Sequence, residues 1–292
     1  MNRRSFLLSM AITPIVGVIA ACGDPKQQST STEPTSPSTT PDTTPSTTLA
    51  GIAHPTGAGD VVLQLSYEGG FVAPDYLFAS VPSLLVSGDG RVFTQGLTPA
   101  IYPGALLPSI LVRTITEDGI QILLGIADAA GLLAAPADYS GGLQVADAPN
   151  TVVTINAKGG SFIHSAYALG IDNPESPVRG RLLDAVNAFS NLELTVGAAE
   201  LGTNEAFVAT TYRLRATATD PSASAGQEPA PSVVDWPAGA GVSLANASEC
   251  ARVDADAVGS LFVDATQNTY FRDGDVVYRL ATRGVLPADP AC

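Results

Sequence analysis

The sequence predicts an α+β fold in which about three helices pack on antiparallel β-hairpins. Stretches with the apolar period of helices alternate with β-branched stretches that turn at glycines. A helix followed by a hairpin occurs twice, near residues 116–169 and again near 254–282. We expect a signal peptide and a disordered linker before this fold, which leaves roughly 240 residues, enough to bury a core.

The first 21 residues have the order of a secretory signal peptide. Arg3 and Arg4 precede about fifteen apolar residues, and small residues stand before Cys22. The tetrapeptide IAAC, which ends at Cys22, resembles a bacterial lipobox, in which the cysteine receives a diacylglyceryl group. We therefore predict that residues 1–21 are removed and that Cys22 is lipidated. The alternative is an ordinary signal peptide in which Cys22 is incidental.

The two arginines also resemble an export signal. Arg3 and Arg4 are followed by Phe6 and Leu7, as in the twin-arginine translocation motif, although Asn2 stands where Ser or Thr is usual. Twin-arginine translocation is therefore expected, and the general secretory route stays open.

Residues 22–52 are rich in Ser, Thr and Pro with scattered acids. Such a segment cannot bury enough apolar surface to offset its chain entropy, so we predict a disordered linker. The exported α+β domain is expected over residues 53–292. Its division into two subdomains, 53–200 and 201–292, is left open.

The first strands are expected directly after this linker. Residues 60–67 alternate between apolar and polar side chains, which is typical of a half-buried strand. Residues 83–96 indicate two short strands joined by Gly88-Asp89-Gly90, because these residues tolerate the positive φ of a tight turn.

A helix is predicted over residues 117–130. The hydroxyl of Thr116 can cap its N-terminus, and Gly131 can end it. Its apolar face consists of Ile120, Leu123, Leu124 and Ala127. The period of this segment is therefore that of an amphipathic helix.

A hairpin and a second helix follow. Residues 151–170 are β-branched and turn at Lys158-Gly159-Gly160. The second helix starts with Ser176 as its cap and Pro177 at its first position. Its apolar side consists of Val178, Leu182, Ala185, Val186 and Phe189.

The last third repeats this order. Residues 206–218 alternate as one strand. A third helix is expected with Asp254 as its N-cap and with Val253 and Val258 as a hydrophobic staple. A hairpin then follows, in which Asp273-Gly274 is a type I′ turn signal.

Cys250 and Cys292 remain once Cys22 is assigned to lipid. An even pair of cysteines in an exported chain predicts a disulfide, and two free thiols are the alternative. This bond would tie the last residue to the entrance of the third helix and would stabilise the fold by roughly 4 kcal/mol.

The charge balance excludes one class of partner. The chain has 28 acidic and 14 basic residues, a formal net charge of −14, so its surface repels nucleic acid. His54 is expected in the disordered approach to the domain, and His164 is expected to be an ordinary strand residue. Neither a nucleophile elbow nor an S-x-x-K motif occurs.

Metal and cofactor motifs are likewise not found in the sequence. Asp254 and Asp256 begin a D-x-D pattern that does not continue as a calcium loop, so helix capping explains them better. Trp236 could stack on a sugar at a rim, but a core position is favoured. No catalytic, cofactor-binding or metal-binding residue is therefore predicted.

Four short stretches carry a family resemblance: LLVSGDGRVFTQG, AAGLLAAP, DWP and YRLATRGVLPADPAC. They resemble uncharacterised lipoproteins of high-GC Gram-positive bacteria. The resemblance implies lipid anchoring through Cys22, and it implies no activity and no catalytic residue.

Together these features predict a lipid-anchored protein on the outer face of the cytoplasmic membrane, in the cell envelope. The expected function is that of a non-enzymatic binding or accessory module for an envelope protein or a small ligand. The alternatives are a secreted carboxylate-dependent hydrolase and an extracellular enzyme-inhibitor domain. A cleft with converging acids would favour the hydrolase, and a flat apolar patch would favour a partner.

Overall fold

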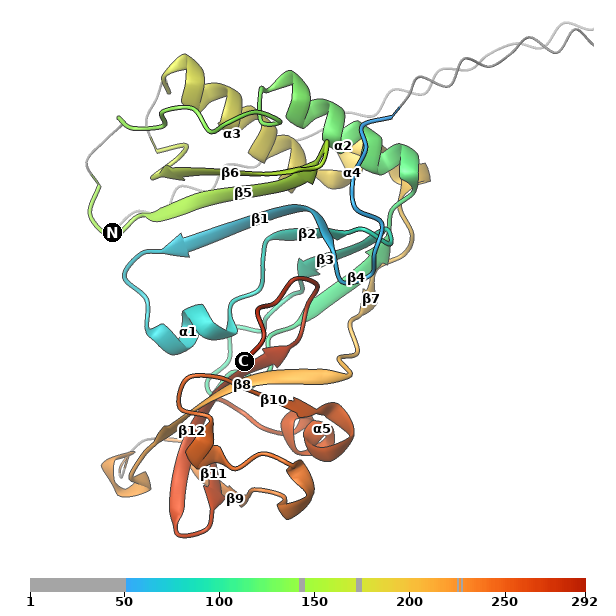
Figure 1. Cartoon of the computed structure of the whole chain (residues 1–292). Helices are drawn as coiled ribbons and strands as arrows, with labels where there is room; N and C mark the ends of the chain where they lie inside the picture. The colour runs from blue at the N-terminus through green and yellow to red at the C-terminus, as the bar shows by residue number, and fades with distance from the viewer. Residues whose placement is uncertain (1–50, 142–144, 172–174, 225, 227) are drawn as a thin grey trace, which may run out of the picture. The chain divides into compact units, whose positions relative to one another are not determined.

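A computed structural model describes residues 51–141, 145–171, 175–224, 226 and 228–292. It confirms the predicted α+β class, with two largely antiparallel sheets and five α-helices in the described part of the chain (Figure 1). The predicted signal peptide, lipidation site and export signal, with Arg3, Arg4 and Cys22, lie outside these residues. Within the described ranges, no helix has both the length and the apolar composition that crossing a membrane requires.

The larger sheet has seven strands in the order β6-β5-β1-β2-β3-β4-β7, and all neighbouring pairs are antiparallel. The predicted turn at Lys158 and Gly159 is confirmed, because both residues have positive φ, 52° and 72°. The strands are β1 (Val61–Gly69), β2 (Leu84–Ser87), β3 (Arg91–Gln95), β4 (Ile110–Thr114), β5 (Pro149–Ala157), β6 (Gly160–Tyr167) and β7 (Glu205–Ala206).

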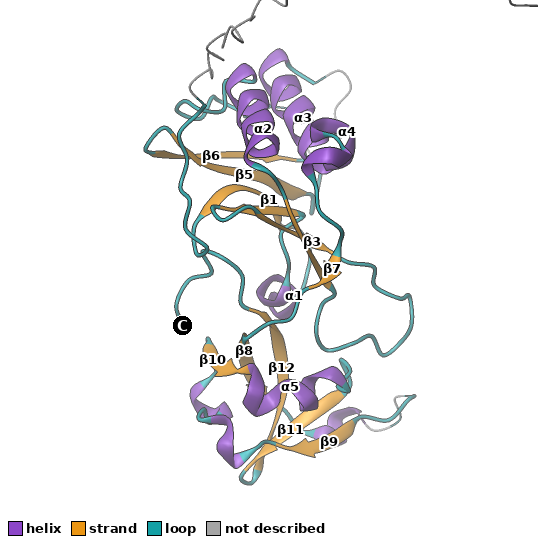
Figure 2. Ribbon diagram, turned by 90° about the vertical axis from the view of Figure 1, so that its right-hand side faces the viewer, coloured by secondary structure: helices purple, strands orange, loops and turns teal. Residues whose placement is uncertain are grey.

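Three helices cover one face of this sheet (Figure 2). They are α2 (Glu117–Ala129), α3 (Pro177–Ser190) and α4 (Leu192–Val196). The predicted caps of the two long helices are confirmed: the Thr116 hydroxyl accepts from the Gly119 N–H at 3.2 Å, and the Ser176 hydroxyl accepts from the Arg179 N–H at 3.4 Å. The apolar faces of these helices pack against alternate residues of the strands and form one core with them. Residues three or four positions apart share a helix face and residues two positions apart share a strand face, so this spacing decides which side chains each element buries.

The opposite face of the larger sheet carries a smaller apolar cluster. It contains Leu286, which follows the last strand, so the C-terminal segment lies against this face. Arg283 donates to both carboxylate oxygens of Asp289, at 2.6 Å each, and thereby holds the segment in place. The strand members of the cluster are Val61, Leu85, Phe93 and Ile110.

The smaller sheet has five strands in the order β10-β8-β12-β11-β9, and only the β11–β9 pair is parallel. The helix α5 (Ala255–Val263) packs on it through Phe262, whose ring contacts Tyr212, Trp236 and Phe271. The strands are β8 (Thr211–Ala218), β9 (Ser232–Asp235), β10 (Ala251–Asp254), β11 (Thr269–Asp273) and β12 (Val276–Gly284). Short 3-10 turns lie at Ala198–Glu200, Pro221–Ser224, Ala238–Ala240 and Leu244–Asn246.

The prediction of one strand over residues 206–218 is confirmed for residues 211–218, which form β8, and is wrong for its start. The first residue, Ala206, ends β7, and the two strands lie in different sheets: β7 pairs with β4, and β8 pairs with β10 and β12. The sequence pattern does not reveal which partner each strand takes, because pairing depends on residues far away in the chain.

Two local predictions near the third helix also differ from the structure. Asp254 occupies the predicted N-cap position of α5, but its side chain makes no capping hydrogen bond there, and the residue also ends β10, where it pairs with Thr211. In the last hairpin, Asp273 pairs with Val276, and of the two loop residues only Gly274 has positive φ, 62°. This is the pattern of a type II′ turn and not of the predicted type I′ turn.

The prediction that His54 lies in a disordered approach is also wrong. Its side chain is only 4% exposed, and its Nε2 atom lies 3.0 Å from Glu117. The segment around it is bound to the domain, because the Ile52 N–H donates to Gln121 and the Lys158 N–H donates to the Ala53 carbonyl. Long-range hydrogen bonds of this kind leave no periodic signal in the sequence.

Candidate functional site

A cavity of about 320 Å³ opens between the short helix α1 (Pro74–Ala79), the loop from β3 to β4, and Gln267 next to the five-stranded sheet. Pockets that bind small molecules have volumes of roughly 300–1,000 Å³, so this cavity lies at the lower end of that range. Its walls come from segments that are far apart in the chain.

The described residues that line the cavity are apolar or neutral. Tyr67 and Tyr76 contribute aromatic rings, and Leu97, Ile101 and Leu106 contribute aliphatic side chains. Neutral hydroxyl and amide groups come from Ser80, Ser83, Gln95, Thr98, Ser109 and Gln267. None of these seventeen lining residues is charged. A charged group of a ligand would lose its hydration here without gaining an ion partner, so the cavity suits a neutral molecule.

The helix α1, which forms one wall, buries none of its own residues. It is held through Asp75, which accepts hydrogen bonds from Arg215 of β8 and from Arg279 of β12, the latter at 2.7 Å. Next to this contact, the Arg213 guanidinium lies 4.4 Å from the centroid of the Phe78 ring. The five-stranded sheet therefore fixes a wall of the cavity that belongs to the β1–β2 connection.

The loop between β3 and β4 forms the facing wall. The Leu106 N–H donates to the Ala265 carbonyl at 2.9 Å, and the Gln267 N–H donates to the Gly104 carbonyl at 2.9 Å. The Tyr102 hydroxyl donates to Asn268 at 3.2 Å. These bonds hold the middle of a long loop in one place, which is what a preformed binding site needs.

Large apolar side chains are exposed around the mouth of the cavity. Sixteen large apolar residues are exposed in the described part of the chain, and eight of them belong to residues 67–77 and 97–102. These eight are Tyr67, Phe71, Val72, Tyr76, Leu77, Leu97, Ile101 and Tyr102. Apolar residues grouped in this way are typical of interaction sites, whereas apolar residues scattered singly over a surface are not.

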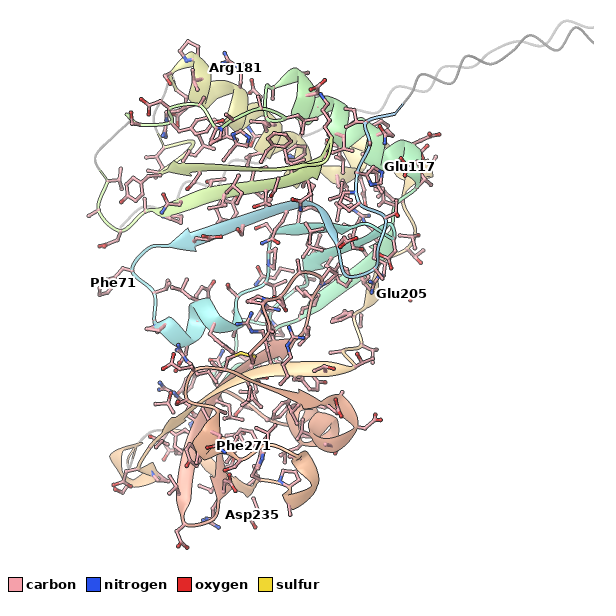
Figure 3. All side chains as sticks on the ribbon, in the orientation of Figure 1. Phe71, Glu117, Arg181, Glu205, Asp235 and Phe271 are labelled. Carbon is pink, nitrogen blue, oxygen red and sulfur yellow. A yellow bond between two sulfur atoms is a disulfide. The ribbon has the colours of Figure 1, made fainter. Side chains whose placement is uncertain are left out.

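The predicted disulfide partners lie close together. The Cα atoms of Cys250 and Cys292 are 5.1 Å apart, within the range of disulfide-bonded cysteines (Figure 3). Their oxidation in the cell stays a prediction. Neither residue is among those that line the cavity.

The other residues considered from the sequence have structural partners. His164 is fully buried between the Tyr139 hydroxyl and the Leu132 carbonyl, each at 2.8 Å from a ring nitrogen. Trp236 is buried in the core of the smaller sheet and donates to the Val242 carbonyl. Asp273 accepts from Ser243 and from the Leu244 N–H. Among the described residues, no three His, Cys, Asp or Glu side chains come together as metal ligands would.

Several carboxyl groups have shifted pKa values, and the shifts share one direction. The pKa is lowered in Asp75, Asp89, Glu117, Asp138, Glu175 and Asp220. Burial raises the pKa of Asp75, but hydrogen bonds from Arg215 and Arg279 outweigh this effect. A general acid needs a pKa raised toward neutrality, so these six groups behave as ion-pair and hydrogen-bond partners.

One feature of the sequence could have indicated the cavity, which was not predicted: no charged residue occurs between Arg91 and Arg113. A long uncharged connection between two strands on an acidic protein is itself unusual. The opposite wall, at Tyr67 and Tyr76, could be assigned to the same site only from the structure.

Comparisons of the chain with protein-family models, with curated proteins and with solved structures find no significant match.

Proposed function

We propose that this protein is a non-enzymatic binding module whose cavity takes up a neutral, largely apolar small molecule. The observation that carries the proposal is the cavity lined by seventeen uncharged residues, between two walls that are fixed by long-range hydrogen bonds. Apolar walls supply the favourable burial, and the few hydroxyl and amide groups can orient the ligand.

We further propose that the module is displayed on the outer face of the cytoplasmic membrane by a lipid on Cys22. The lipobox-like IAAC and the family resemblance support this location. Two acyl chains hold a protein on a bilayer far more firmly than one. Intact-mass analysis of the processed native chain should show the added lipid, and the same analysis of a Cys22→Ser chain should show none. A processed chain with an unmodified N-terminus would rule out this anchor.

The two alternatives from the sequence have less support. A carboxylate-dependent hydrolase needs a general acid with a raised pKa in a cleft, whereas the shifted carboxyl groups described above have lowered values and none of them lines the cavity. An enzyme-inhibitor domain would use its exposed loops against a protein, and no feature of the described loops favours an enzyme as the target.

The ligand proposal can be tested with a neutral dye. The full chain carrying Cys22→Ser is titrated with Nile red, whose fluorescence rises when it leaves water, and with an anionic naphthalene sulfonate dye. Ala105 lines the cavity, and Ala105→Trp would fill part of it. Ala100 lies in the same loop but does not line the cavity, so Ala100→Trp is the matched control.

We expect Nile red to bind more tightly than the anionic dye, because the cavity offers no cation. Ala105→Trp should weaken Nile red binding at least about tenfold, whereas Ala100→Trp should leave it within about twofold. Equal effects of the two substitutions, or preference for the anionic dye, would contradict the proposal. Mass spectrometry of the chain purified from native cells without detergent would then identify the natural ligand.

A further inference from the structure

We infer that the loop pair at residues 68–77 and 96–106 docks the folded domain on a lipid bilayer, with the mouth of the cavity toward the lipid. This surface is distinct from the anchor at Cys22, because it belongs to the folded domain itself. The inference rests partly on the proposed function, since a bilayer is the source from which a neutral apolar ligand would enter.

The first argument is the exposure of the loop tips. Phe71 is 89% exposed and Leu97 is 94% exposed, although both are large apolar side chains. Phe71 projects away from the ribbon at the end of β1 (Figure 3). Side chains that remain in water to this extent gain the most free energy when a hydrocarbon phase covers them. Aromatic residues beside them, such as Tyr76 and Tyr102, suit the boundary between hydrocarbon and water.

The second argument is charge. The protein is acidic overall, yet residues 96–106 carry no charge and residues 68–77 carry only Glu68 and Asp75. Asp75 is neutralised by Arg215 and Arg279. Anionic lipid head groups would repel the acidic remainder of the surface, and this uncharged patch would meet the least repulsion. A bilayer therefore fits this patch better than it fits other parts of an acidic protein.

The third argument is the length of the chain between the proposed lipid anchor and the folded domain. The sequence places 28 residues between Cys22 and Gly51, where the described domain begins. If this segment is the disordered linker that the sequence predicts, it would span on the order of 30 Å. Such a linker would keep the domain at high local concentration near the bilayer, so a weak apolar contact would be enough to keep it docked.

The test uses the full chain carrying Cys22→Ser, so that no lipid contributes to binding. Amide hydrogen exchange is measured with and without vesicles of phosphatidylcholine. Exchange is read separately in each segment, so any binding through the leader does not obscure the two loops. Phe71→Ser and Leu97→Ser each replace the most exposed large apolar side chain of one loop. Leu194→Ser, at a residue that is 89% exposed on α4, is the matched control.

We expect vesicles to slow exchange in residues 68–77 and 96–106 by at least about fivefold, as for local structures covered by a partner. Phe71→Ser and Leu97→Ser should each abolish most of this protection, and Leu194→Ser should not. Unchanged exchange on adding vesicles would overturn the inference. So would protection of the same loops without vesicles in a concentration-dependent manner, because a second copy of the chain would then cover the patch.

Nile red binding and protection by vesicles together distinguish the ligand proposal from the docking inference. Phe71 does not line the cavity, so Phe71→Ser should leave Nile red binding intact while it abolishes vesicle protection. A chain that binds Nile red but shows no vesicle protection refutes the docking inference alone. A chain that docks on vesicles, but in which Ala105→Trp and Ala100→Trp weaken Nile red binding equally, refutes the ligand proposal alone.

Discussion

The carboxylate of Asp75 accepts a 2.7 Å hydrogen bond from Arg279, although 204 positions separate the two residues in the chain. Asp75 lies in α1, in the connection between two strands of the larger sheet, and Arg279 lies in β12 of the smaller sheet. Arg215 of β8 donates to the same carboxylate. One side chain thus fixes a wall of the candidate cavity to a different part of the fold.

Removing this carboxylate should loosen α1. Asp75→Asn leaves Arg215 without its charged partner, and we expect the free energy of unfolding to fall by about 1–2 kcal/mol, because Arg279 is half exposed and contributes less than a buried ion pair would. Urea denaturation measures this change. Nile red binding should weaken in parallel, since α1 carries Tyr76.

An exposed ion pair provides the comparison. Arg272 and Asp235 lie 3.3 Å apart and are both well exposed. Asp235→Asn should therefore change the free energy of unfolding by less than about 0.5 kcal/mol. An equal loss in the two variants would show that Asp75 has no special role in holding α1.

The buried pair of Arg179 and Glu175 should make stability depend on pH. The Glu175 side chain is 4% exposed and accepts from Arg179 at 2.5 Å, and this hydrogen bond lowers the pKa of Glu175 below its ordinary value of 4.5. The folded chain therefore binds this proton less tightly than the unfolded chain. The resulting stability is complete above pH 4.5 and is lost as the pH falls through the lowered pKa.

Glu175→Gln should accordingly reduce the free energy of unfolding by about 3 kcal/mol at neutral pH and flatten its decline in acid. Urea denaturation at a series of pH values gives both quantities. Glu249 is exposed, so Glu249→Gln serves as the matched control and should leave the acid decline in place. An unchanged slope in Glu175→Gln would show that other groups govern the acid response.

The His164 ring should carry a proton on Nε2. The Leu132 carbonyl can only accept, so the Nε2 atom 2.8 Å away must donate, and Nδ1 is left to accept from the Tyr139 hydroxyl. Nitrogen-15 NMR of the imidazole distinguishes this tautomer from the other forms. Tyr139→Phe should leave Nδ1 unpaired in a buried position and lower the free energy of unfolding by about 1–2 kcal/mol. A signal of the Nδ1–H tautomer would contradict this assignment.

The predicted disulfide has a mass signature and a stability effect. The exported chain should be lighter than its reduced form by two hydrogen atoms. The bond joins residues 42 positions apart, and its removal by Cys250→Ser with Cys292→Ser should reduce the free energy of unfolding by roughly 4 kcal/mol, according to the chain-entropy treatment. Recovery of two alkylated thiols from unreduced native protein would refute the bond.

Much of the fold could be predicted from local signals in the sequence. Thr116 and Ser176 cap the helices they were expected to cap, and the turn at Lys158 and Gly159 adopts positive φ. These features depend on hydrogen bonds and steric limits within a few residues, so the sequence carries them directly. The spacing of apolar residues in the sequence likewise identified which faces of α2 and α3 are buried.

The candidate site could not be predicted in this way. Tyr67 and Leu97 line one cavity because β1 and the β3–β4 loop are brought together, and Gln267 completes it from the connection between α5 and β11. The strand prediction over residues 206–218 missed the end of β7 for the same reason, since distant pairing partners decide which sheet each strand joins.

The sequence alone therefore determined the α+β class, the two long helices with their caps at Thr116 and Ser176, the turn at Lys158 and Gly159, and the acidic character of the chain, because composition and short-range interactions govern these properties. The tertiary structure alone decided which residues face the cavity, that Asp75 joins α1 to the smaller sheet, and that His54 is packed against α2. Those outcomes depend on contacts between residues that are far apart in the chain, by 63 positions for His54 and Glu117 and by 204 for Asp75 and Arg279, and such contacts stabilise the fold only once the chain has folded.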